Sequence, residues 1–283
     1  MKPNYNEESK KYLMPDISCV IVSYNNLNFL ERAVNSVLEQ THPVDEIIIA
    51  DDGSTDGSRE LIVSLAYREG NIRPIFRERN IGVAANRDLA IRSSTCELIT
   101  TLDGDDYYFP SKIENEFRAL RDYGDAVAFS DVVLVGLDGC RIKKLNLSSI
   151  PKLTHQKRLR YLANRSGYIP RDMLMSKHLY LKAGGFKHDL RIYEDWDFKI
   201  RLAALPTNWV YSGTEGIAYR QTGRGLSSAS HFIHLRSQYK VIRLNKKIIL
   251  EKLGIVYYIE SLLRLLYNWI KAVVLKVYRK LKN

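Results

Sequence analysis

The feature that most constrains the fold of this chain is an alternation of short apolar runs with amphipathic segments between residues 17 and 129. The apolar runs predict a buried strand at residues 17–22 and further strands at residues 46–50, 72–76, 98–102 and 126–129. The intervening segments predict helices at residues 27–40, 54–66, 83–91 and 111–120. We expect Ser54 or Thr55 to cap the second of these helices. Strands that alternate with helices predict an α/β fold, with a mostly parallel, Rossmann-like sheet flanked by helices.

Beyond residue 131 the pattern is weaker. Residues 141–170 are basic and weakly periodic, which indicates a loop or short helices. The remaining predicted elements are strands at 173–175, 209–211 and 217–219, turns at 136–139 and 183–186, and a helix at 195–205. We divide the chain into a polar N-terminal extension (residues 1–15), an α/β domain (16–225) and a C-terminal helical tail (226–283).

The positive charge of the chain is concentrated near its C-terminal end. The formal net charge is +11, and residues 240–283 contain eleven Lys or Arg against two Glu. The rest is therefore nearly neutral, which argues against a nucleic-acid partner. The cysteines, Cys19, Cys96 and Cys140, show no metal or disulfide spacing, as expected in a reducing compartment. Residues 1–16 lack the apolar core of a signal peptide, so we expect a cytoplasmic protein.

The tail predicts an amphipathic helix that lies on a membrane surface. Residues 255–278 are rich in Leu, Ile, Val, Tyr and Trp. Their polar residues recur at helical spacing as a narrow stripe: Glu260, Arg264, Asn268 and Lys271. A spanning helix needs roughly 18 apolar residues, and a central Arg or Lys costs about 2.5–3.5 kcal/mol. We therefore expect residues 240–283 to bind the anionic inner face of the cell membrane peripherally. Packing on its own domain or in a dimer is the alternative.

Carboxylates cluster where two of the predicted strands end. Asp51 and Asp52 follow the second strand, and Asp103, Asp105 and Asp106 follow the fourth. Ligands bind at the carboxyl ends of strands in such sheets. Close carboxylates repel one another unless a cation lies among them, so the second cluster predicts a Mg²⁺ or Mn²⁺ site. An isolated Asp-Gly-Asp-Asp is otherwise a solvated turn. Glycine-rich phosphate and dinucleotide motifs are absent from the sequence, so a phosphate must be bound through metal and side chains.

Six short motifs follow one another in a specific order and spacing. They are Val20-Ile21-Val22-Ser23-Tyr24-Asn25, Asp51-Asp52-Gly53-Ser54, Asn80-x-Gly82 with Arg87, Leu102-Asp103-Gly104-Asp105-Asp106 before Pro110, Gly184-Gly185-Phe186, and Glu194-Asp195-Trp196. Together they resemble the family 2 glycosyltransferases of the GT-A fold, over residues 16–222. The resemblance implies an inverting transferase with a nucleotide-sugar-binding part (16–131) and an acceptor-binding part (132–225).

The resemblance also implies roles for residues on the donor side. Tyr24 and Asp52 would contact the nucleotide, and Asp51 would support their turn. Asp103 would approach the ribose or the metal. Arg87 offers a two-pronged contact to a diphosphate, although a plain surface arginine explains it equally well.

The metal and acceptor sites follow from the same resemblance. Asp105 would bind the metal together with Asp103, and Asp106 would hold the ion's waters or shape the loop. Asp195 matches the catalytic base, and as a helix N-terminal carboxylate it also interacts favourably with the helix dipole. The remaining acceptor-side residues are Gly185, Glu194 and Trp196.

The predicted chemistry needs both acidic sites. One carboxylate takes the proton of an acceptor hydroxyl as it attacks the anomeric carbon, and a metal stabilises the departing nucleoside diphosphate. The chain lacks the Gln-x-x-Arg-Trp motif of processive synthases, which favours transfer of a single sugar. Many relatives have a His after the Tyr-Arg segment, where this chain has Arg224, with His231 further on.

Three functions are compatible with these patterns. The leading one is transfer of a sugar, from a nucleotide-sugar that we expect to be a UDP-sugar, to a polysaccharide or a lipid-linked oligosaccharide. The second is nucleotidyl transfer on a similar sheet, with release of pyrophosphate. The third is a non-catalytic membrane-binding module in which only the tail acts. The nearly neutral body and the paired acidic sites favour the first.

Overall fold

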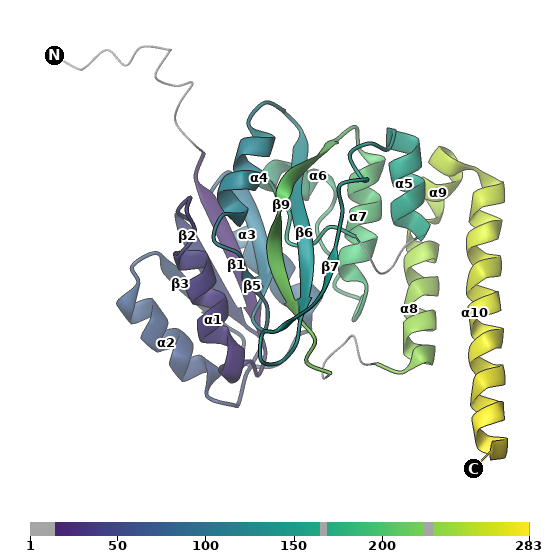
Figure 1. Ribbon diagram of the computed structural model, residues 1–283, viewed down its shortest axis with the longest axis horizontal. Helices are drawn as coiled ribbons and strands as arrows, with labels where there is room; N and C mark the ends of the chain where they lie inside the picture. The colour runs from purple at the N-terminus through teal and green to yellow at the C-terminus, as the bar shows by residue number, and fades with distance from the viewer. Residues whose placement is uncertain (1–14, 165–168, 224–228, 283) are drawn as a thin grey trace.

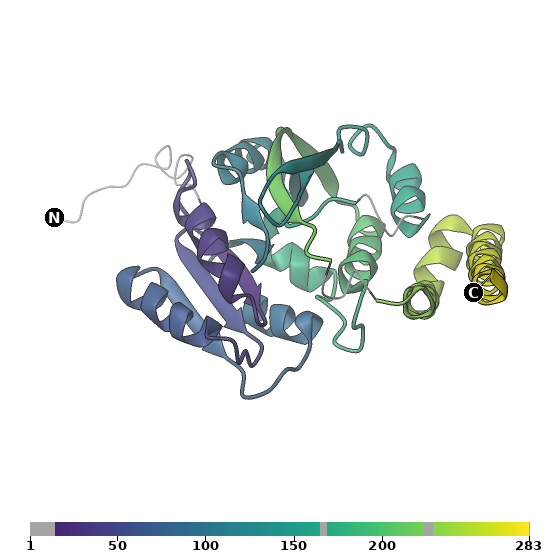
Figure 2. The same cartoon turned by 60° about the horizontal axis from the view of Figure 1, so that its bottom comes forward.

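The computed structural model describes residues 15–164, 169–223 and 229–282, and only the backbone of residues 275–282 (Figure 1). One central sheet is flanked by helices, and the C-terminal helices stand beyond one edge of it, as Figures 1 and 2 show. The strand order is β3-β2-β1-β4-β8-β6-β9-β5, and β7 pairs with β6. The predicted N-terminal extension lies outside the described residues except for Pro15.

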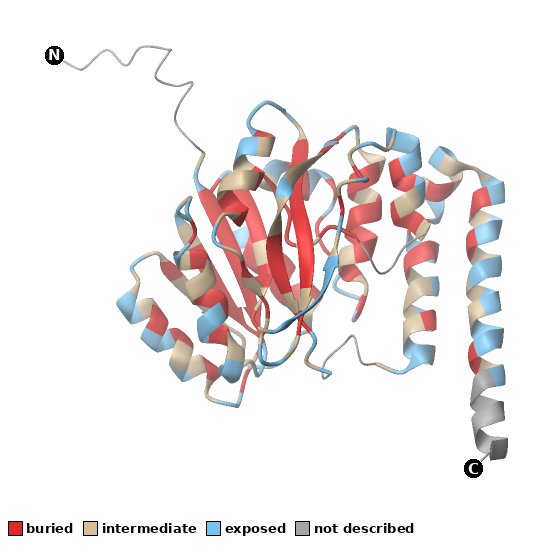
Figure 3. Cartoon of the chain, viewed as in Figure 1, coloured by how far each residue is buried: buried red, intermediate tan, exposed pale blue. Residues whose placement is uncertain are grey.

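The first half of the sheet is parallel, as predicted. Its strands are β1 (Ile17–Ser23), β2 (Glu46–Asp51), β3 (Ile72–Phe76) and β4 (Leu98–Asp103). The connecting helices are α1 (Leu27–Leu38), α2 (Ser58–Arg68) and α3 (Val83–Ser93). Every residue of β1 is buried, which agrees with its continuous apolar run (Figure 3). The periodicity of this half therefore predicts its elements correctly.

The second helix begins later than predicted. Its N-cap is Gly57, with φ of +94°, rather than Ser54 or Thr55. The Ser54 hydroxyl accepts a hydrogen bond from the Asn25 amide at 2.8 Å, and the Thr55 amide donates to the Asn25 side chain at 2.9 Å. Both predicted caps thus lie in a turn that is hydrogen-bonded to Asn25, and the helix begins beyond this turn.

The second half of the sheet is mixed. Its strands are β5 (Tyr107–Tyr108), β6 (Ala126–Val135), β7 (Arg141–Leu145), β8 (Leu174–Ser176) and β9 (Asn208–Arg220). β6 runs parallel to β9 and antiparallel to β7 and β8, and β5 runs antiparallel to β9. The predicted strand at 126–129 is thus too short. A loop or short helices were expected over 141–170, and this segment contains the strand β7 and a short helix. The helices here are α4 (Lys112–Leu120), α5 (His155–Asn164), α6 (Lys177–Lys182) and α7 (Glu194–Ala204).

A single strand replaces the two predicted at 209–211 and 217–219. β9 pairs with β6 on both sides of an irregularity, from Phe129 opposite Tyr211 to Val132 opposite Ile217. The polar, glycine-containing residues between the two apolar runs hide this continuity in the sequence. The predicted division after residue 131 falls inside β6, so the two parts are halves of one sheet.

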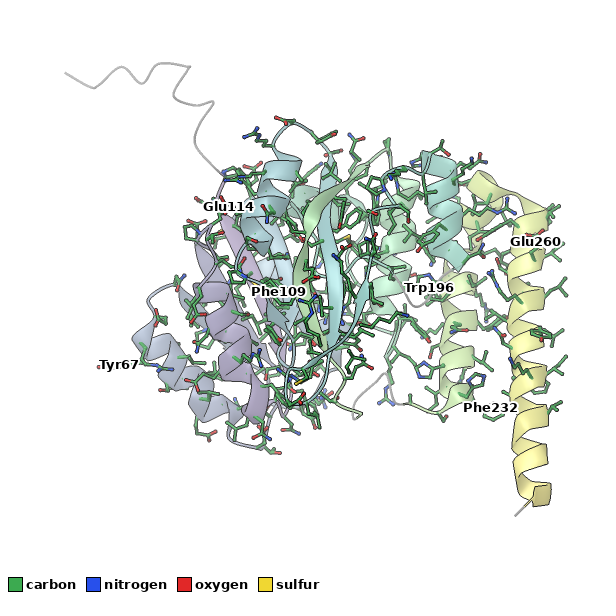
Figure 4. All side chains as sticks on the ribbon, in the orientation of Figure 1. Tyr67, Phe109, Glu114, Trp196, Phe232 and Glu260 are labelled. Atoms are coloured by element: carbon green, nitrogen blue, oxygen red, sulfur yellow. The ribbon has the colours of Figure 1, made fainter. Side chains whose placement is uncertain are left out.

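The tail forms three helices that pack on the body. They are α8 (His231–Leu244), α9 (Lys246–Leu253) and α10 (Ile255–Lys282). Part of the predicted polar stripe faces α5: Glu260 lies 3.4 Å from Arg160, and Arg264 donates to Asn164. Figure 4 shows Glu260 on α10, at the edge of the molecule. Within the described residues, no helix has a stretch long and apolar enough to cross a bilayer.

Candidate active site

A cavity of about 870 Å³ opens at the carboxyl ends of β1 and β4 and extends to the N-terminus of α7. Seven of the predicted site residues line it: Tyr24, Asp52, Arg87, Asp103, Asp105, Glu194 and Asp195. They come from segments that are up to 171 positions apart, between residues 24 and 195. The fold therefore brings the predicted donor and acceptor residues into one cavity.

Three of the predicted residues do not line this cavity. Asp51 is fully buried, and its Oδ2 accepts hydrogen bonds from the amides of Gly53 and Ser54 at 3.2 and 3.0 Å. It thus supports the turn and is not part of the cavity lining. Trp196 is buried, and its indole N–H donates to the carbonyl of Leu162 at 2.6 Å, which ties α7 to α5.

Gly185 is the third, and it has a packing role. Its φ is +61°, and an added Cβ would lie 2.4 Å from Asp88 Oδ1. Asp88 also accepts from the Phe186 amide at 3.3 Å, so a side chain at Gly185 would break this contact. Phe186 itself lines the cavity. Arg224 lies outside the described residues.

On the donor side, Tyr24 and Asp52 flank the cavity. Tyr24 is 48% exposed, which leaves its ring available to a flat ligand group. The two carboxylate oxygens of Asp52 accept from the amides of Ile81 and Gly82 at 2.8 and 2.9 Å. Burial raises the pKa of Asp52 against the opposing effect of these amides. Asp52 thus fixes the loop that begins at Asn80 beside the cavity.

The acidic loop, which we define as Asp103 at the end of β4 and the residues up to Asp106, crowds three carboxylates together. Oxygen atoms of Asp103, Asp105 and Asp106 lie within 4.8 Å of one another. Burial and the charge of Asp103 raise the pKa of Asp105 to about 6. Asp106 Oδ1 accepts from the Arg220 amide at 2.8 Å, which shapes the loop, whereas its buried Oδ2 accepts no hydrogen bond from the described residues. This crowded set of hard oxygen ligands fits Mg²⁺ or Mn²⁺.

Two arginines neutralise part of that charge. Arg87 donates to Asp103 Oδ1 and, at 3.1 Å, to Glu194 Oε1, so it joins the acidic loop to α7. Arg171 lies 2.6 Å from Asp103 Oδ2 and 3.2 Å from Asp106 Oδ2. Burial raises the pKa of Asp103, but the two guanidinium groups outweigh it and hold the pKa below its usual value. Asp105 forms no ion pair with the residues described here.

On the acceptor side, Asp195 and Glu194 begin α7 but differ in environment. The Asp195 side chain is 37% exposed, and its Oδ2 accepts from the Lys199 ammonium at 2.7 Å. Burial raises the pKa of Asp195, but Lys199, Arg171 and Arg87 together bring it below the usual value. Burial and the charge of Asp195 raise the pKa of Glu194 to about 7. Asp195 is therefore the ionised, accessible carboxylate, and Glu194 is held by Arg87.

Arg171 and Lys199 are cavity residues that the sequence analysis missed. Lys199 lies four positions after Asp195, so its helical spacing was a usable signal. Arg171 approaches Asp103 from 68 positions away, and no local pattern marks it.

A family model described as glycosyl transferase family 2 matches residues 18–182. This is more than half of the chain. The chain belongs to glycosyl transferase family 2. The family 2 resemblance seen in the motifs is thus confirmed.

Individual relatives extend this result. The chain is 32% identical over 130 residues to the putative teichuronic acid biosynthesis glycosyltransferase TuaG of Bacillus subtilis, a match that covers 46% of the chain and 52% of TuaG. The chain therefore spans about half the length of this relative. It is 28% identical over 242 residues to the succinoglycan biosynthesis protein ExoU of Rhizobium meliloti, which covers 81% of the chain and 69% of ExoU.

Solved structures confirm the fold. The S. aureus TarS 1-349 structure in complex with UDP-GlcNAc superposes with a TM-score of 0.68 and 18% identity. The match covers 84% of this family 2 chain and 67% of that one. The predicted GT-A fold is thus observed, with a mixed second half of the sheet and additional C-terminal helices.

Proposed function

We propose that the protein is a metal-dependent, inverting glycosyltransferase that moves one sugar from a nucleotide-sugar of the UDP class to a glycan acceptor. One observation carries the proposal: a single cavity holds both the acidic loop after β4 and the ionised carboxylate of Asp195. TarS crystallises with UDP and UDP-GlcNAc, and TuaG and ExoU are named for polysaccharide biosynthesis. These names support a UDP-sugar donor and a polysaccharide or lipid-linked oligosaccharide acceptor.

The residues of the cavity divide the work. Asp105 and Asp103 would hold the metal, which as a Lewis acid would stabilise the charge that develops on the leaving diphosphate. Asp195 takes the proton of the acceptor hydroxyl. The Lys199 ammonium and the Trp196 amide donate hydrogen bonds to the Asp195 carboxylate at 2.7 and 2.8 Å and so orient this carboxylate. Tyr24 and Asp52 border the space for the nucleoside.

Donor screening tests this function directly. The protein is incubated with a panel of UDP-, GDP- and dTDP-sugars and Mn²⁺, and release of the nucleoside diphosphate is measured. We expect slow, EDTA-sensitive hydrolysis of one donor even without an acceptor. Pyrophosphate release from a nucleoside triphosphate, with no nucleotide-sugar turnover, would instead support nucleotidyl transfer.

The pH profile tests the contact between Lys199 and Asp195. Replacing Lys199 with Met removes the cation that opposes burial, so the pKa of Asp195 rises and the base becomes protonated at a higher pH. We expect the acid limb of the kcat–pH profile to move up by about 1–3 pH units. Lys182→Met is the control, because Lys182 pairs with the exposed Asp125 away from the cavity. An unmoved acid limb in Lys199→Met would contradict this role.

We further propose that α10 binds the anionic cytoplasmic face of the cell membrane, where a lipid-linked acceptor would lie. One side of α10 packs on the body through Tyr257 and Ser261, both buried. The opposite side leaves apolar side chains exposed at helical spacing: Ile259, Leu263, Leu266, Ile270 and Val274. Basic residues of the tail would attract anionic headgroups.

Vesicle flotation tests this placement. The double variant Leu263→Glu/Leu266→Glu changes two residues that are 58% and 51% exposed. Each leucine that is buried in the bilayer contributes about 1.5–3 kcal/mol, so the affinity of the double variant for vesicles that contain phosphatidylglycerol should fall at least about 100-fold. Val63→Glu/Tyr67→Glu is the control on α2, because Figure 4 shows Tyr67 at the opposite edge of the molecule. Unchanged flotation of the α10 variant would contradict membrane binding, and a dimer-to-monomer change would support a self-association surface instead.

A further inference from the structure

The carboxylate of Asp103 already has a cation on each oxygen. Arg87 donates to Oδ1, and Arg171 donates to Oδ2 at 2.6 Å. Arg171 also lies 3.2 Å from Asp106 Oδ2, the buried oxygen that accepts no hydrogen bond from the described residues. The protein's own guanidinium groups therefore occupy oxygens that a divalent cation at this loop would need.

Arg171 is the more accessible of the two arginines. Its side chain is 20% exposed, against 7% for Arg87, which is also held by Glu194. The Arg171 guanidinium stacks on the Tyr219 ring at 4.0 Å, and both residues line the cavity. A ligand that reaches the acidic loop therefore meets Arg171.

This arrangement has a thermodynamic consequence. A metal ion that arrives alone must compete with a guanidinium for the oxygens of Asp103 and Asp106. A nucleoside diphosphate offers that guanidinium new oxygen acceptors in a two-pronged geometry. Diphosphate binding would draw Arg171 away and expose the carboxylates, so each ligand would favour the other.

We propose that Arg171 couples nucleotide binding to metal binding, by moving from Asp103 and Asp106 to the diphosphate of the donor. The proposal rests on the donor class proposed above and adds a residue to it. Without Arg171 the loop would attract a cation whether or not a nucleotide is present.

Titration calorimetry with Mn²⁺ and UDP tests the coupling. The Mn²⁺ affinity is measured with and without saturating UDP, and corrected for Mn²⁺–UDP complexes in solution. We expect UDP to tighten Mn²⁺ binding by roughly 5–150-fold in the natural protein. Arg171→Gln should bind Mn²⁺ alone about tenfold more tightly than the natural protein, and it should bind UDP more weakly. The gain in Mn²⁺ affinity that UDP causes should therefore be several-fold smaller in this variant. The direct attraction between Mn²⁺ and UDP is common to both proteins and cancels in the comparison.

Matched variants make the outcome decisive. Arg191→Gln removes another cation from the same cavity, one with no ion pair to the acidic loop among the described residues, and should leave the coupling unchanged. Arg171→Lys keeps the positive charge but loses the second hydrogen-bond donor of the guanidinium. The affinity for Mn²⁺ alone should therefore stay low, while the affinity for UDP falls. If Arg171→Gln folds only with Mn²⁺, the metal replaces the guanidinium, and this result supports the proposal. If Arg171→Gln does not fold at all, the test is the UDP affinity of Arg171→Lys. An unchanged UDP affinity in Arg171→Lys overturns the proposal.

Two failures are distinguishable. Unchanged Mn²⁺ affinity and unchanged coupling in Arg171→Gln overturn the role of Arg171 alone. If the natural protein binds no nucleoside diphosphate with Mn²⁺, the proposed donor site is wrong, and the coupling is overturned with it.

Discussion

Replacing Asp195 with Asn is expected to lower kcat by roughly 10²–10⁴-fold, the usual contribution of a general base, with little change in the affinity for UDP or Mn²⁺. The reason is geometric. Asp195 is partly exposed in the cavity, on α7, whereas the crowded carboxylates that fit the metal lie on the loop after β4. The amide keeps the size of the side chain but cannot accept the acceptor's proton. Single-turnover assays and UDP calorimetry on the same preparation measure both quantities.

Two further variants separate this role from its neighbours. Asp189→Asn is the matched control, because Asp189 is exposed and pairs with Lys240 outside the cavity lining. Glu194→Gln should weaken donor binding as well as turnover, because Glu194 holds Arg87 at 3.1 Å. If Asp195→Asn turned over at a near-normal rate and Glu194→Gln were inactive, the general base would be Glu194. Its pKa of about 7 also suits that role.

Replacing Asp105 with Asn is expected to lower kcat/KM for the nucleotide-sugar by roughly 10²–10³-fold, in the range of other transition-state charge stabilisers, and to abolish measurable Mn²⁺ binding. Asp105 is the loop carboxylate with no ion pair among the described residues, so it is the most available ligand. EDTA treatment of the natural protein should lower its activity to the same extent, and added Mn²⁺ should restore the activity.

Stability separates this effect from misfolding. Burial and Asp103 hold the pKa of Asp105 at about 6, above its ordinary value, so its ionised form at neutral pH destabilises the metal-free fold. Asn removes that charge, and the metal-free variant should melt no lower than the natural protein. Asp122→Asn, at an exposed acidic residue, is the control. Full activity after EDTA and in Asp105→Asn would show that Arg87 and Arg171 stabilise the leaving group without a metal.

Local patterns predicted the first half of the fold correctly. β1 and β2 are nearly continuous apolar runs because parallel strands are covered on both faces, and each run can be recognised by itself. The second half of the sheet was harder to predict from the sequence, because β6 pairs with β9 through residues about 80 positions apart, such as Phe129 and Tyr211. Polar residues inside β9 are tolerated because the strand is irregular there.

Local sequence patterns were enough to identify acidic residues that meet in the cavity: Asp103 and Asp105 at the end of β4 and just after it, and Glu194 and Asp195 at the start of α7. Residue type and position after a strand or at a helix start are local properties, and they identify chemistry without coordinates. Which cations face these acids depends on how the chain packs in three dimensions. Arg171 reaches Asp103 across 68 positions, and Arg87 reaches Glu194 across 107. An ion pair of this kind depends on distance in space, and that distance is set when the sheet and helices pack.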